Sequence, residues 1–406
     1  MSISRRSLLG AAAAVPAIPL LGRRARAQNN TIKIGVLNDQ SGPYRDTGGT
    51  TGVICAKLAV EEFAAKGFNV EVISADHQNK PDVGAAIARQ WYDRDGVDMI
   101  LDVPTSSVAL AVAAVAKEKN KLHINVGAAT VELTGKSCAP SVIHWAYDTF
   151  MLAKSTGGAT VRAGGDSWYF ITADYAFGHQ LQKDTTTMVT GSGGKVLGSS
   201  AYPFPGTTDF SSFLLQAQSS GAKVLGLANA GADTVNSIKQ AKEFGIRMKI
   251  ASMLMFITDV NALGLDVAQG LTLTESFYWD LNDRTRAFTK KVAARSPNNW
   301  PNMTHAGNYS GTLHFLKAVN DMGVAEAKKS GSGIADRMKA MPTDDDAFGA
   351  GSIRKDGRAL FPSYLFEVKK PSESKAKWDY YKLIATTPAA QAWRPMNEGG
   401  CYFVTS

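Results

Sequence analysis

Cysteine is scarce in this sequence, which limits both disulfides and metal sites. Only Cys55, Cys138 and Cys401 occur among 406 residues, too few for a disulfide framework and without the spacing of a zinc site. One pair can bridge in an oxidising compartment, and Cys138 and Cys401, which lie in polar segments typical of loops, are the favoured pair. Cys55 lies in an apolar helical pattern and is expected in the core. The sequence leaves the bridge itself open.

Catalytic and metal-binding motifs are also missing. The sequence contains no nucleophile elbow, no phosphate-binding P-loop and no paired histidines of a metalloprotease helix. Its 6 histidines are scattered, and the acidic run Asp344–Asp346 lacks the alternation of a calcium loop. We therefore expect no cofactor and no metal. We also expect a binding protein rather than an enzyme, with an exported hydrolase or lyase as the less favoured class.

A long hydrophobic run is missing too, although the chain begins with an apolar stretch. A helix that spans a bilayer needs about 20 apolar residues, whereas the stretch 11–21 is shorter and is interrupted by Pro16 and Pro19. It follows the pair Arg5–Arg6 and precedes the small-residue pattern Ala-Arg-Ala at 25–27. This arrangement is typical of a twin-arginine export signal that ends at residue 27, and it predicts a protein of the periplasm.

The basic excess does not indicate a nucleic-acid partner. The formal net charge is +8, but residues 1–27 hold five arginines and no acidic residue, so the rest of the chain carries +3. That part contains no basic run interleaved with aromatic residues. We therefore expect no nucleic acid and, past residue 27, no membrane segment.

What the sequence does contain is two series of short apolar strands that alternate with amphipathic helices. Alternation of this kind is typical of parallel sheets covered by helices. Strands are expected at 32–38, 70–75, 99–103 and 123–126, and again at 168–172, 195–202, 224–228 and 249–252. Helices follow at 283–295, 309–322 and 333–341, and a late strand at 363–369 is expected to join one of the existing sheets.

The predicted fold class is therefore α/β, with two Rossmann-like doubly wound lobes joined by a hinge that the chain crosses several times. We assign residues 28–145 and 276–345 to the first lobe and residues 146–275 to the second. Residues 346–406 are expected to return to the second lobe and form the C-terminal tail. A hinge between two lobes creates a cleft whose closure traps a ligand.

The candidate site follows from where ligands bind in open parallel sheets, beyond the carboxyl ends of the strands and against helix N-termini. The loops there carry hydroxyl groups for an anion site, small residues that let the backbone approach a ligand, and aromatic or methionine side chains for an apolar wall. Each also has an ordinary structural explanation, such as a helix cap or core packing. The candidates are Tyr44, Thr105, Ser106, Ala128, Ala129, Thr130, Tyr175, Asn229, Asp233 and Met255.

Several segments, taken in their order along the chain, resemble a known family. It comprises the periplasmic substrate-binding proteins of ABC importers of the branched-chain amino acid and amide type. The resemblance extends over essentially the whole chain after residue 27. The segments that carry it are 32–44, Thr105–Ser107, Gly127–Thr134, Asp174–Gly178, Thr208–Phe210 and Gln240–Gly245. It implies a type I periplasmic-binding fold with three crossovers, a ligand enclosed between the lobes, and docking of the closed form on a permease with its ATPase. A monomer is usual in this family.

The resemblance also implies roles for particular residues. In this family a Ser/Thr helix start and a small-residue loop hold the ligand carboxylate, and a tyrosine before the first long helix of the second lobe contacts the ligand. The corresponding residues here are Thr105, Ser106, Ala128, Ala129, Thr130 and Tyr175.

One departure from the family pattern bears on the ligand. The amino-acid binders place an acidic residue near Leu254 to neutralise the ammonium group, whereas the segment Met253–Phe256 has no carboxylate. A buried ammonium without a partner costs several kcal/mol, and burying an aromatic ring against such residues gains roughly 1.5–3 kcal/mol. The sequence therefore predicts a small carboxylate with an aromatic or apolar body, such as a benzoate, hydroxybenzoate or cinnamate.

Two alternatives of the same fold remain open. One is a binder of branched-chain amino acids, amides or urea, in which Asp233 serves as the partner of the ammonium group. The other is a ligand sensor that passes its signal to a separate protein. For the predicted aromatic carboxylate, Asn229 or Asp233 is expected to be able to hold a ring hydroxyl or an amine.

Overall fold

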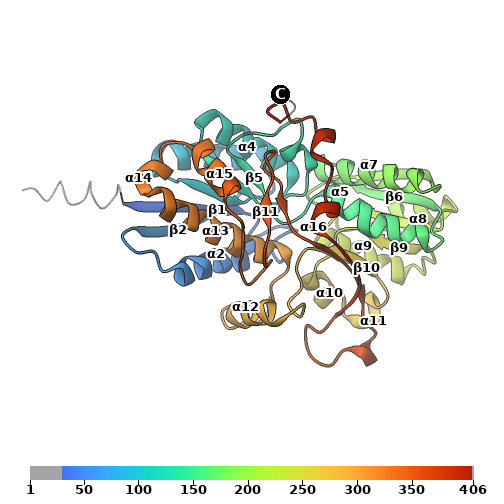
Figure 1. Ribbon diagram of the computed structural model, residues 1–406. Coiled ribbons are helices and arrows are strands. Elements are labelled where there is room, and N and C mark those ends of the chain that lie inside the picture. Colours follow the sequence, from blue (N-terminus) through green and yellow to red (C-terminus); the bar gives the residue numbers. More distant parts are fainter. Residues whose placement is uncertain (1–29, 405–406) are drawn as a thin grey trace, which may run out of the picture.

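The computed structural model describes residues 30–404 as two α/β lobes side by side, with a third, antiparallel sheet next to the second lobe (Figure 1). Both lobes contain a parallel sheet with helices on its two faces, which confirms the predicted fold class. The predicted export signal at 1–27 lies outside the described residues. Within residues 30–404, no helix is long and apolar enough to cross a bilayer.

The first lobe is built on a five-stranded parallel sheet in the order β2-β1-β3-β4-β5. Ile34 on the second strand of this order lies opposite Val72 on one side and Met99 on the other. The strands are β1 (Thr31–Asn38), β2 (Asn69–Asp76), β3 (Met99–Asp102), β4 (Leu122–Asn125) and β5 (Val142–His144).

Alternating residues of these strands serve the two faces of the sheet. Ile34 and Leu101 pack in one core with α2 (Gly49–Phe63), α13 (Met303–Met322) and α15 (Gly331–Ala340). Leu37 and Ile100 pack in another with α4 (Ser106–Lys119) and α3 (Pro81–Gln90), which continues as a π-helical turn over Trp91–Asp95. The lobe also holds α12 (Asp283–Ala293) and α14 (Val324–Ala327). Because α12 to α15 follow the second lobe in sequence, the chain returns to complete the first.

The second lobe repeats this plan with a four-stranded parallel sheet in the order β7-β6-β8-β9. Phe170 faces a core shared with α7, whereas its neighbour Ile171 faces α8 and α9. The strands are β6 (Ser167–Ala173), β7 (Lys195–Tyr202), β8 (Val224–Ala228) and β9 (Lys249–Ser252). The helices are α5 (Thr149–Leu152), α6 (Gly158–Arg162), α7 (Ala176–Gly191), α8 (Ser211–Ser219), α9 (Ala232–Glu243), α10 (Ile257–Leu263) and α11 (Leu265–Ala268).

The late strand does not join either parallel sheet, so that expectation is wrong. It becomes β13 (Ser363–Val368), the centre of a separate antiparallel sheet with β10 (Thr272–Glu275) and β14 (Tyr381–Thr387). An aromatic cluster holds this sheet together, with ring centroids of Tyr278 and Tyr381 4.8 Å apart and those of Phe366 and Tyr381 5.1 Å apart. A strand's own sequence specifies its two faces but not its partner, which is why the expectation failed.

The chain passes between the first sheet and the rest of the molecule three times: between β5 and α5, between β10 and α12, and after the hairpin of β11 (Ser352–Ile353) and β12 (Ala359–Leu360). This hairpin adjoins the first lobe, because Arg358 forms a bridge with His144 at the end of β5. Contacts of residues 346–406 are therefore divided between the lobes. The assignment of residues to lobes made from the sequence stays a prediction.

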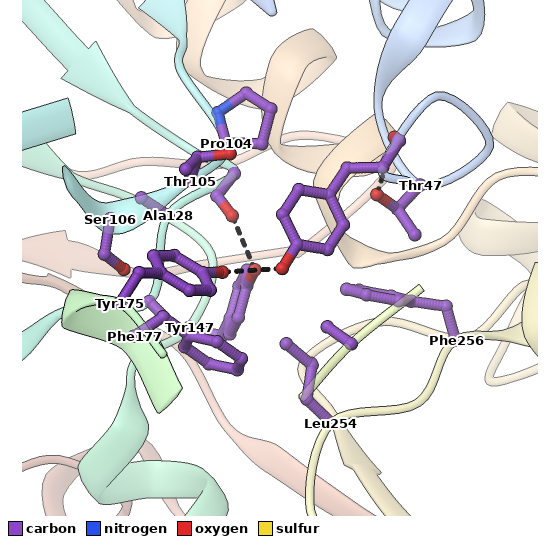
Figure 2. A pocket seen from close by; sticks show the side chains of 14 residues that line it. Thr47, Pro104, Thr105, Ser106, Ala128, Tyr147, Tyr175, Phe177, Leu254 and Phe256 are labelled. Carbon is purple, nitrogen blue, oxygen red and sulfur yellow. Dashed lines mark hydrogen bonds between the residues drawn. The ribbon is translucent and has the colours of Figure 1, made fainter. Parts of the chain in front are cut away.

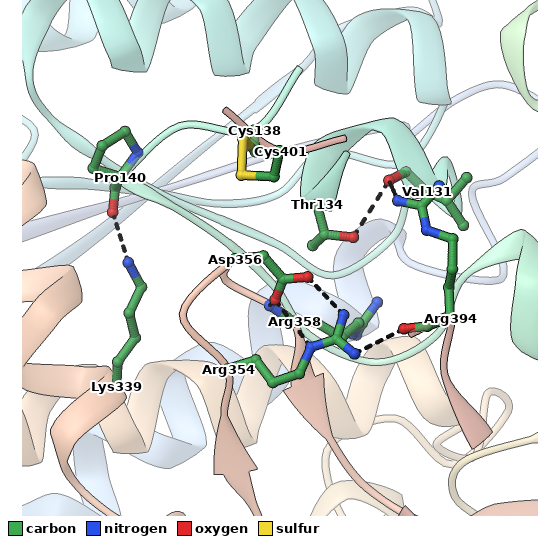
Figure 3. Close-up of a disulfide and its surroundings, with 10 residues drawn as sticks. All are labelled: Val131, Thr134, Cys138, Pro140, Lys339, Arg354, Asp356, Arg358, Arg394 and Cys401. Carbon is green, nitrogen blue, oxygen red and sulfur yellow. Dashed lines mark hydrogen bonds and ion pairs between the residues drawn. A yellow bond between two sulfur atoms is a disulfide. The ribbon is translucent and has the colours of Figure 1, made fainter. Parts of the chain in front are cut away.

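The C-terminal tail is fastened to the first lobe by the cysteine pair that the sequence favoured (Figure 3). The sulfur atoms of Cys138 and Cys401 are bonded at 2.11 Å, whereas Cys55 is free and buried. Arg394, after α16 (Ala389–Ala392), donates to the carbonyl of Val131 at 2.9 Å. The tail thus closes over the loops of the first lobe.

Candidate ligand-binding site

A pocket lies between the two lobes at the carboxyl ends of their parallel strands (Figure 2). The cavity measures about 290 Å³, including its mouth toward solvent. Its lining consists of hydroxyl-bearing and small residues from the first lobe and of aromatic and aliphatic residues from both. They are Tyr44, Thr47, Pro104, Thr105, Ser106, Gly127, Ala128, Ala129, Tyr147, Tyr175, Phe177, Ala230, Leu254 and Phe256.

The polar end of the pocket is the start of α4. Ser106 is the first residue of this 14-residue helix, and its buried hydroxyl has no hydrogen-bond partner among the described residues. The hydroxyl of Thr105 donates instead to the side-chain oxygen of Asn79. Free N–H groups and the positive end of the helix dipole favour an anion at such a position. Ser106 therefore has an unused hydroxyl where an anion is favoured.

The backbone that leads into this helix adopts an unusual conformation. Asp102, Val103 and Thr105 have φ angles of 82°, 54° and 78°, a region that β-branched residues such as Val and Thr rarely enter. The strained turn is held from β4, because the N–H groups of Val126 and Gly127 donate to the carbonyl of Asp102 at 2.9 and 3.1 Å. Strain of this kind is concentrated at ligand-binding turns.

The small-residue loop after β4 forms the adjacent wall. A side chain at Gly127 would come within 2.9 Å of the Cα of Pro104, so the two loops touch through their backbones. The carbonyl of Gly127 accepts the Tyr147 hydroxyl at 2.6 Å, and the carbonyl of Ala128 accepts the Asn125 amide at 2.8 Å. Because these carbonyl groups already accept hydrogen bonds within the first lobe, the wall that this loop presents to the pocket consists of small residues.

Aromatic rings form most of the remaining lining, together with Thr47, Ala230 and Leu254, and connect the lobes. The hydroxyl groups of Tyr44, in the first lobe, and Tyr175, in the second, are 2.6 Å apart. The ring of Phe204 stacks on Tyr175, with centroids 4.3 Å apart, and Tyr147 meets Phe256 edge to face at 6.2 Å. Burial raises the pKa of both Tyr44 and Tyr175 well above the usual range, so these phenols are neutral. This wall suits a flat, apolar group.

None of the described residues that line the pocket carries a charged side chain. Asp233 is buried in the second lobe, where it accepts the Tyr202 hydroxyl at 2.8 Å, and burial raises its pKa to about 6. Asn229 accepts the Thr234 hydroxyl at 2.7 Å in the same lobe. Across residues 30–404 there is also no cluster of three or more side chains that could hold a metal ion.

The structure brings together six of the ten residues singled out from the sequence. Thr130, Asn229, Asp233 and Met255 do not line the pocket. Thr130 caps the turn that follows it, by accepting the N–H of Glu132 at 3.3 Å. Met255 is fully buried in the core of the second lobe, whereas its neighbours Leu254 and Phe256 line the pocket. The residues that do line it are Tyr44, Thr105, Ser106, Ala128, Ala129 and Tyr175.

Sequence reasoning missed eight lining residues. Most of them lie in loops that the strand-end rule already marked, where the sequence does not say which side chain faces inward. Tyr147 is the exception: it follows β5 by three residues, and because no strand was expected there from the sequence, the strand-end rule did not mark this loop. The missed residues are Thr47, Pro104, Gly127, Tyr147, Phe177, Ala230, Leu254 and Phe256.

Comparison with known proteins gives relatives that cover nearly the whole chain. A periplasmic binding protein from Burkholderia mallei, solved as a crystal structure, is 48% identical and superposes with a TM-score of 0.88, covering 92% of this chain and 99% of that one. The Leu/Ile/Val-binding protein homolog 4 of Brucella abortus is 24% identical over 402 residues, with 94% of each chain covered. A solute-binding protein from R. palustris, crystallised with benzoate, shares the fold with a TM-score of 0.79 at 19% identity, over 88% of this chain and 97% of that one.

The family itself follows from a match along most of the chain. The model of the family described as periplasmic binding protein matches residues 31–376. This match spans both lobes and all the loops that line the pocket. The resemblance drawn from the sequence is confirmed: this chain belongs to the periplasmic binding protein family.

Proposed function

We propose that this chain is the extracytoplasmic receptor of an ABC importer and that it captures a small carboxylate with an aromatic or apolar body. The observation that carries the proposal is the composition of the pocket. Among residues 30–404, the buried hydroxyl of Ser106 at the polar end has no partner, aromatic rings form much of the walls, and no charged side chain lines the pocket. A carboxylate finds a donor there, whereas an ammonium group finds no counter-charge.

Binding begins on the first lobe in this proposal. The carboxylate accepts hydrogen bonds from the hydroxyl of Ser106 and from the N–H groups at the start of α4. Thr105, Ala128 and Ala129 form the wall beside it. Tyr175, Phe177 and Leu254 of the second lobe then cover the body of the ligand. The ligand shifts the population of closed molecules only by its greater affinity for that state.

Two further points support this function. The R. palustris protein that shares the fold was crystallised with benzoate, a carboxylate of the proposed class. The predicted export signal at 1–27 agrees with delivery to the periplasm, where a permease and its ATPase would receive the loaded receptor.

A branched-chain amino acid is the second candidate, and one observation favours it. Asp233 helps to raise the pKa of both Tyr44 and Tyr175, so it lies within electrostatic reach of the pocket. If its side chain turned away from Tyr202, it would offer the counter-charge that an α-ammonium group needs. The Brucella relative carries the name of a Leu/Ile/Val-binding protein homolog.

A thermal-shift screen of residues 28–406, followed by calorimetric titration, tests the choice. Benzoate, 4-hydroxybenzoate and cinnamate represent the proposed class, leucine and valine the second candidate, and benzamide keeps the ring but lacks the charge. We expect the melting temperature to rise with the aromatic acids and not with benzamide. Tight binding of leucine together with no binding of any aromatic acid would overturn the proposal. Recovery of the ligand unchanged after incubation distinguishes a receptor from an enzyme.

A further inference from the structure

Directly behind the first-lobe wall of the pocket lies a buried carboxylate, Asp102, the last residue of β3. Its Oδ2 accepts the Asn38 amide at 3.1 Å, whereas its Oδ1 has no hydrogen-bond partner among the described residues. A Cβ built on Gly127 would lie 2.7 Å from that free oxygen, and Gly127 itself lines the pocket. One backbone segment therefore separates the unpaired oxygen from the space where we place the ligand.

Among the described residues, no positive charge acts on the carboxyl group of Asp102; Arg295, which acts on the Cys55 thiol, forms an ion pair with Glu61. Asn38 of β1 and Asn308 of α13 offer amides, and glycines at 48 and 52 leave the space that a side chain would fill. Three titratable groups face this cluster: Cys55 of α2, Tyr147 after β5, and His305 of α13, which bonds the carbonyl of Gly48 at 3.0 Å. Burial raises the pKa of the thiol and the phenol and lowers the pKa of the imidazole to about 4, so all three are neutral near pH 7.

We propose that Asp102 takes up a proton when a carboxylate ligand enters the pocket, so that the bound anion lies next to a neutral acid rather than a second negative charge. The proton comes from solvent and forms an O–H bond on the carboxyl group of Asp102. This inference rests on the proposed function, because a neutral ligand would give Asp102 no reason to change its charge.

The direction of the pH effect follows from linkage. Burial raises the pKa of Asp102 to about 6, so the carboxyl group is mostly ionised at pH 7 before the ligand arrives. A negative charge beyond the Gly127 segment disfavours the ionised form and raises this pKa further. Binding then consumes a proton at pH values above about 6, and the affinity for the anion rises as the pH falls toward that value. For one proton the limit is about tenfold in affinity per pH unit.

A second buried acid provides the matched control. Burial raises the pKa of Asp233 to about 6, as it does for Asp102. Asp233 lies in the second lobe, however, and is hydrogen-bonded to Tyr202. Changing Asp233 to Asn removes a comparable buried acid from the opposite side of the pocket. The two variants therefore distinguish proton uptake behind the anion site from proton uptake elsewhere in the cleft.

The experiment is calorimetric titration of benzoate at pH 7 in phosphate and in Tris, two buffers whose ionisation heats differ widely. In the wild-type protein the difference in binding heat should report uptake of a substantial fraction of one proton. Asp102→Asn should abolish this uptake and make the dissociation constant independent of pH between 6 and 8. Asp233→Asn removes only an acid whose carboxylate already accepts the Tyr202 hydroxyl, so most of the uptake should remain in that variant. Binding of benzoate to the wild type without proton uptake, or uptake that persists in Asp102→Asn, would overturn the inference.

Two further outcomes are distinguishable. If Asp102→Asn fails to fold, Asn38→Ala serves instead, because losing the amide on Oδ2 should raise the pH midpoint of proton uptake. An unchanged midpoint in that variant would contradict the assignment to Asp102. If no aromatic acid binds to the wild type at all, the proposed function fails, and the inference fails with it. Binding of benzoate without proton uptake defeats the inference alone.

Discussion

The two hydroxyl residues that begin α4 differ in what they are free to do. The hydroxyl of Thr105 donates its hydrogen bond to the side-chain oxygen of Asn79, so toward a ligand this hydroxyl can only accept a hydrogen bond. Ser106, which also lines the pocket, has a buried hydroxyl that makes no hydrogen bond within the described part of the chain. A buried hydroxyl without a partner costs free energy unless a ligand satisfies it. Binding of an anion thus supplies the hydrogen-bond acceptor that the Ser106 hydroxyl lacks in the free protein.

Ser106→Ala should weaken carboxylate binding and leave the free protein as stable as before or more stable. A hydrogen bond to a charged group contributes about 1.5–3 kcal/mol, so the dissociation constant should rise roughly tenfold or more. Titration calorimetry measures the affinity, and thermal melting of the free protein measures the stability. Ser107→Ala, one residue further on and outside the pocket lining, is the matched control and should change neither. Equal affinities of Ser106→Ala and wild type would place the anion elsewhere.

A further buried acid, Glu275, lies at the end of β10, where the chain leaves the second lobe. Its carboxylate accepts the N–H of Met303 at 3.1 Å and the hydroxyl of Tyr381 at 3.0 Å. Burial raises its pKa from the usual 4.5 to about 8, with a smaller contribution from the charge of Asp259. Glu275 is therefore protonated in the folded protein at pH values where the unfolded chain has lost that proton.

Between pH 4.5 and 8 the folded state binds more protons at Glu275 than the unfolded state does. Its contribution to the free energy of unfolding therefore decreases as the pH rises through this window. Glu275→Gln keeps an oxygen that accepts the N–H of Met303 and offers an amide that can donate to the Tyr381 oxygen, and it should flatten the decline of unfolding free energy with pH. Urea unfolding at several pH values between 5 and 8 measures the slope. An unchanged slope in the variant would contradict the role of Glu275.

Among the elements, α13 shows how tertiary contacts extend a helix. The sequence predicts a helix at 309–322, and the structure begins it six residues earlier, at Met303. Gly307 and Gly311 weaken the helical pattern, yet both are needed for packing: a Cβ on Gly307 would lie 2.5 Å from Val126, and one on Gly311 would lie 3.2 Å from Ile124. The helix thus approaches β4 closely enough to form the back of the first lobe.

Asn302 caps this helix and also supports the pocket. Its side-chain oxygen accepts the N–H groups of Thr304 and His305 at 2.8 and 3.1 Å, and its amide donates to the carbonyl of Thr47 at 3.1 Å. Because Thr47 lines the pocket, the cap of α13 and the shape of the site are connected. The corresponding cap of α12, Asn282, makes a similar bond to Thr285 at 3.0 Å without contact to the pocket.

Asn302→Ala should lower the unfolding free energy by about 1–2 kcal/mol, the usual cost of losing such a cap, and should weaken ligand binding as well. Asn282→Ala is the matched control and should lower stability without changing affinity. Chemical unfolding and calorimetric titration of the two variants measure these effects. If both variants bind the ligand equally well, the contact to Thr47 does not shape the site.

At the scale of the whole molecule, the lobes meet through backbone beside the pocket. The N–H of Ala232, at the start of α9, donates to the carbonyl of Pro43 in the first lobe at 3.1 Å. The preceding residue, Gly231, has a φ of 58°, and a Cβ there would lie 2.5 Å from the same carbonyl. Only glycine allows the lobes to come this close.

Gly231→Ala should hold the lobes apart and weaken ligand binding about tenfold, equivalent to about 1.4 kcal/mol. The positive φ alone also costs stability when alanine replaces glycine. Gly221→Ala separates the two effects, because Gly221 has a φ of 68° in the same lobe but nothing within 4 Å of the added Cβ. We expect both variants to lose stability in thermal melting and only Gly231→Ala to lose affinity. If both variants lost affinity, the weaker binding would come from backbone strain within the lobe and not from the closer contact between the lobes.

The disulfide acts on the whole molecule because it joins residues 263 positions apart. Cross-links of this kind stabilise by about 2–4 kcal/mol, chiefly by restricting the unfolded chain. Reductant should therefore lower the melting temperature of the wild-type protein. The double variant Cys138→Ala with Cys401→Ala should melt at the lower temperature with or without reductant. A wild-type melting temperature that reductant leaves unchanged would show that the bridge contributes little to stability.

The sequence by itself determined eight of the nine strands of the parallel sheets, all but β5, and most of the loops that form the site. Apolar strands and helical periodicity are local properties, and strand ends such as 104–106 and 127–129 follow from them directly. The tertiary structure decided the rest, because the partner of β13, the early start of α13 and the inward direction of Leu254 and Phe256 rather than Met255 depend on contacts between distant segments. The raised pKa of Asp102 likewise depends on tertiary structure, since the pKa of an acid is set by its burial and by the neighbours that folding brings to it.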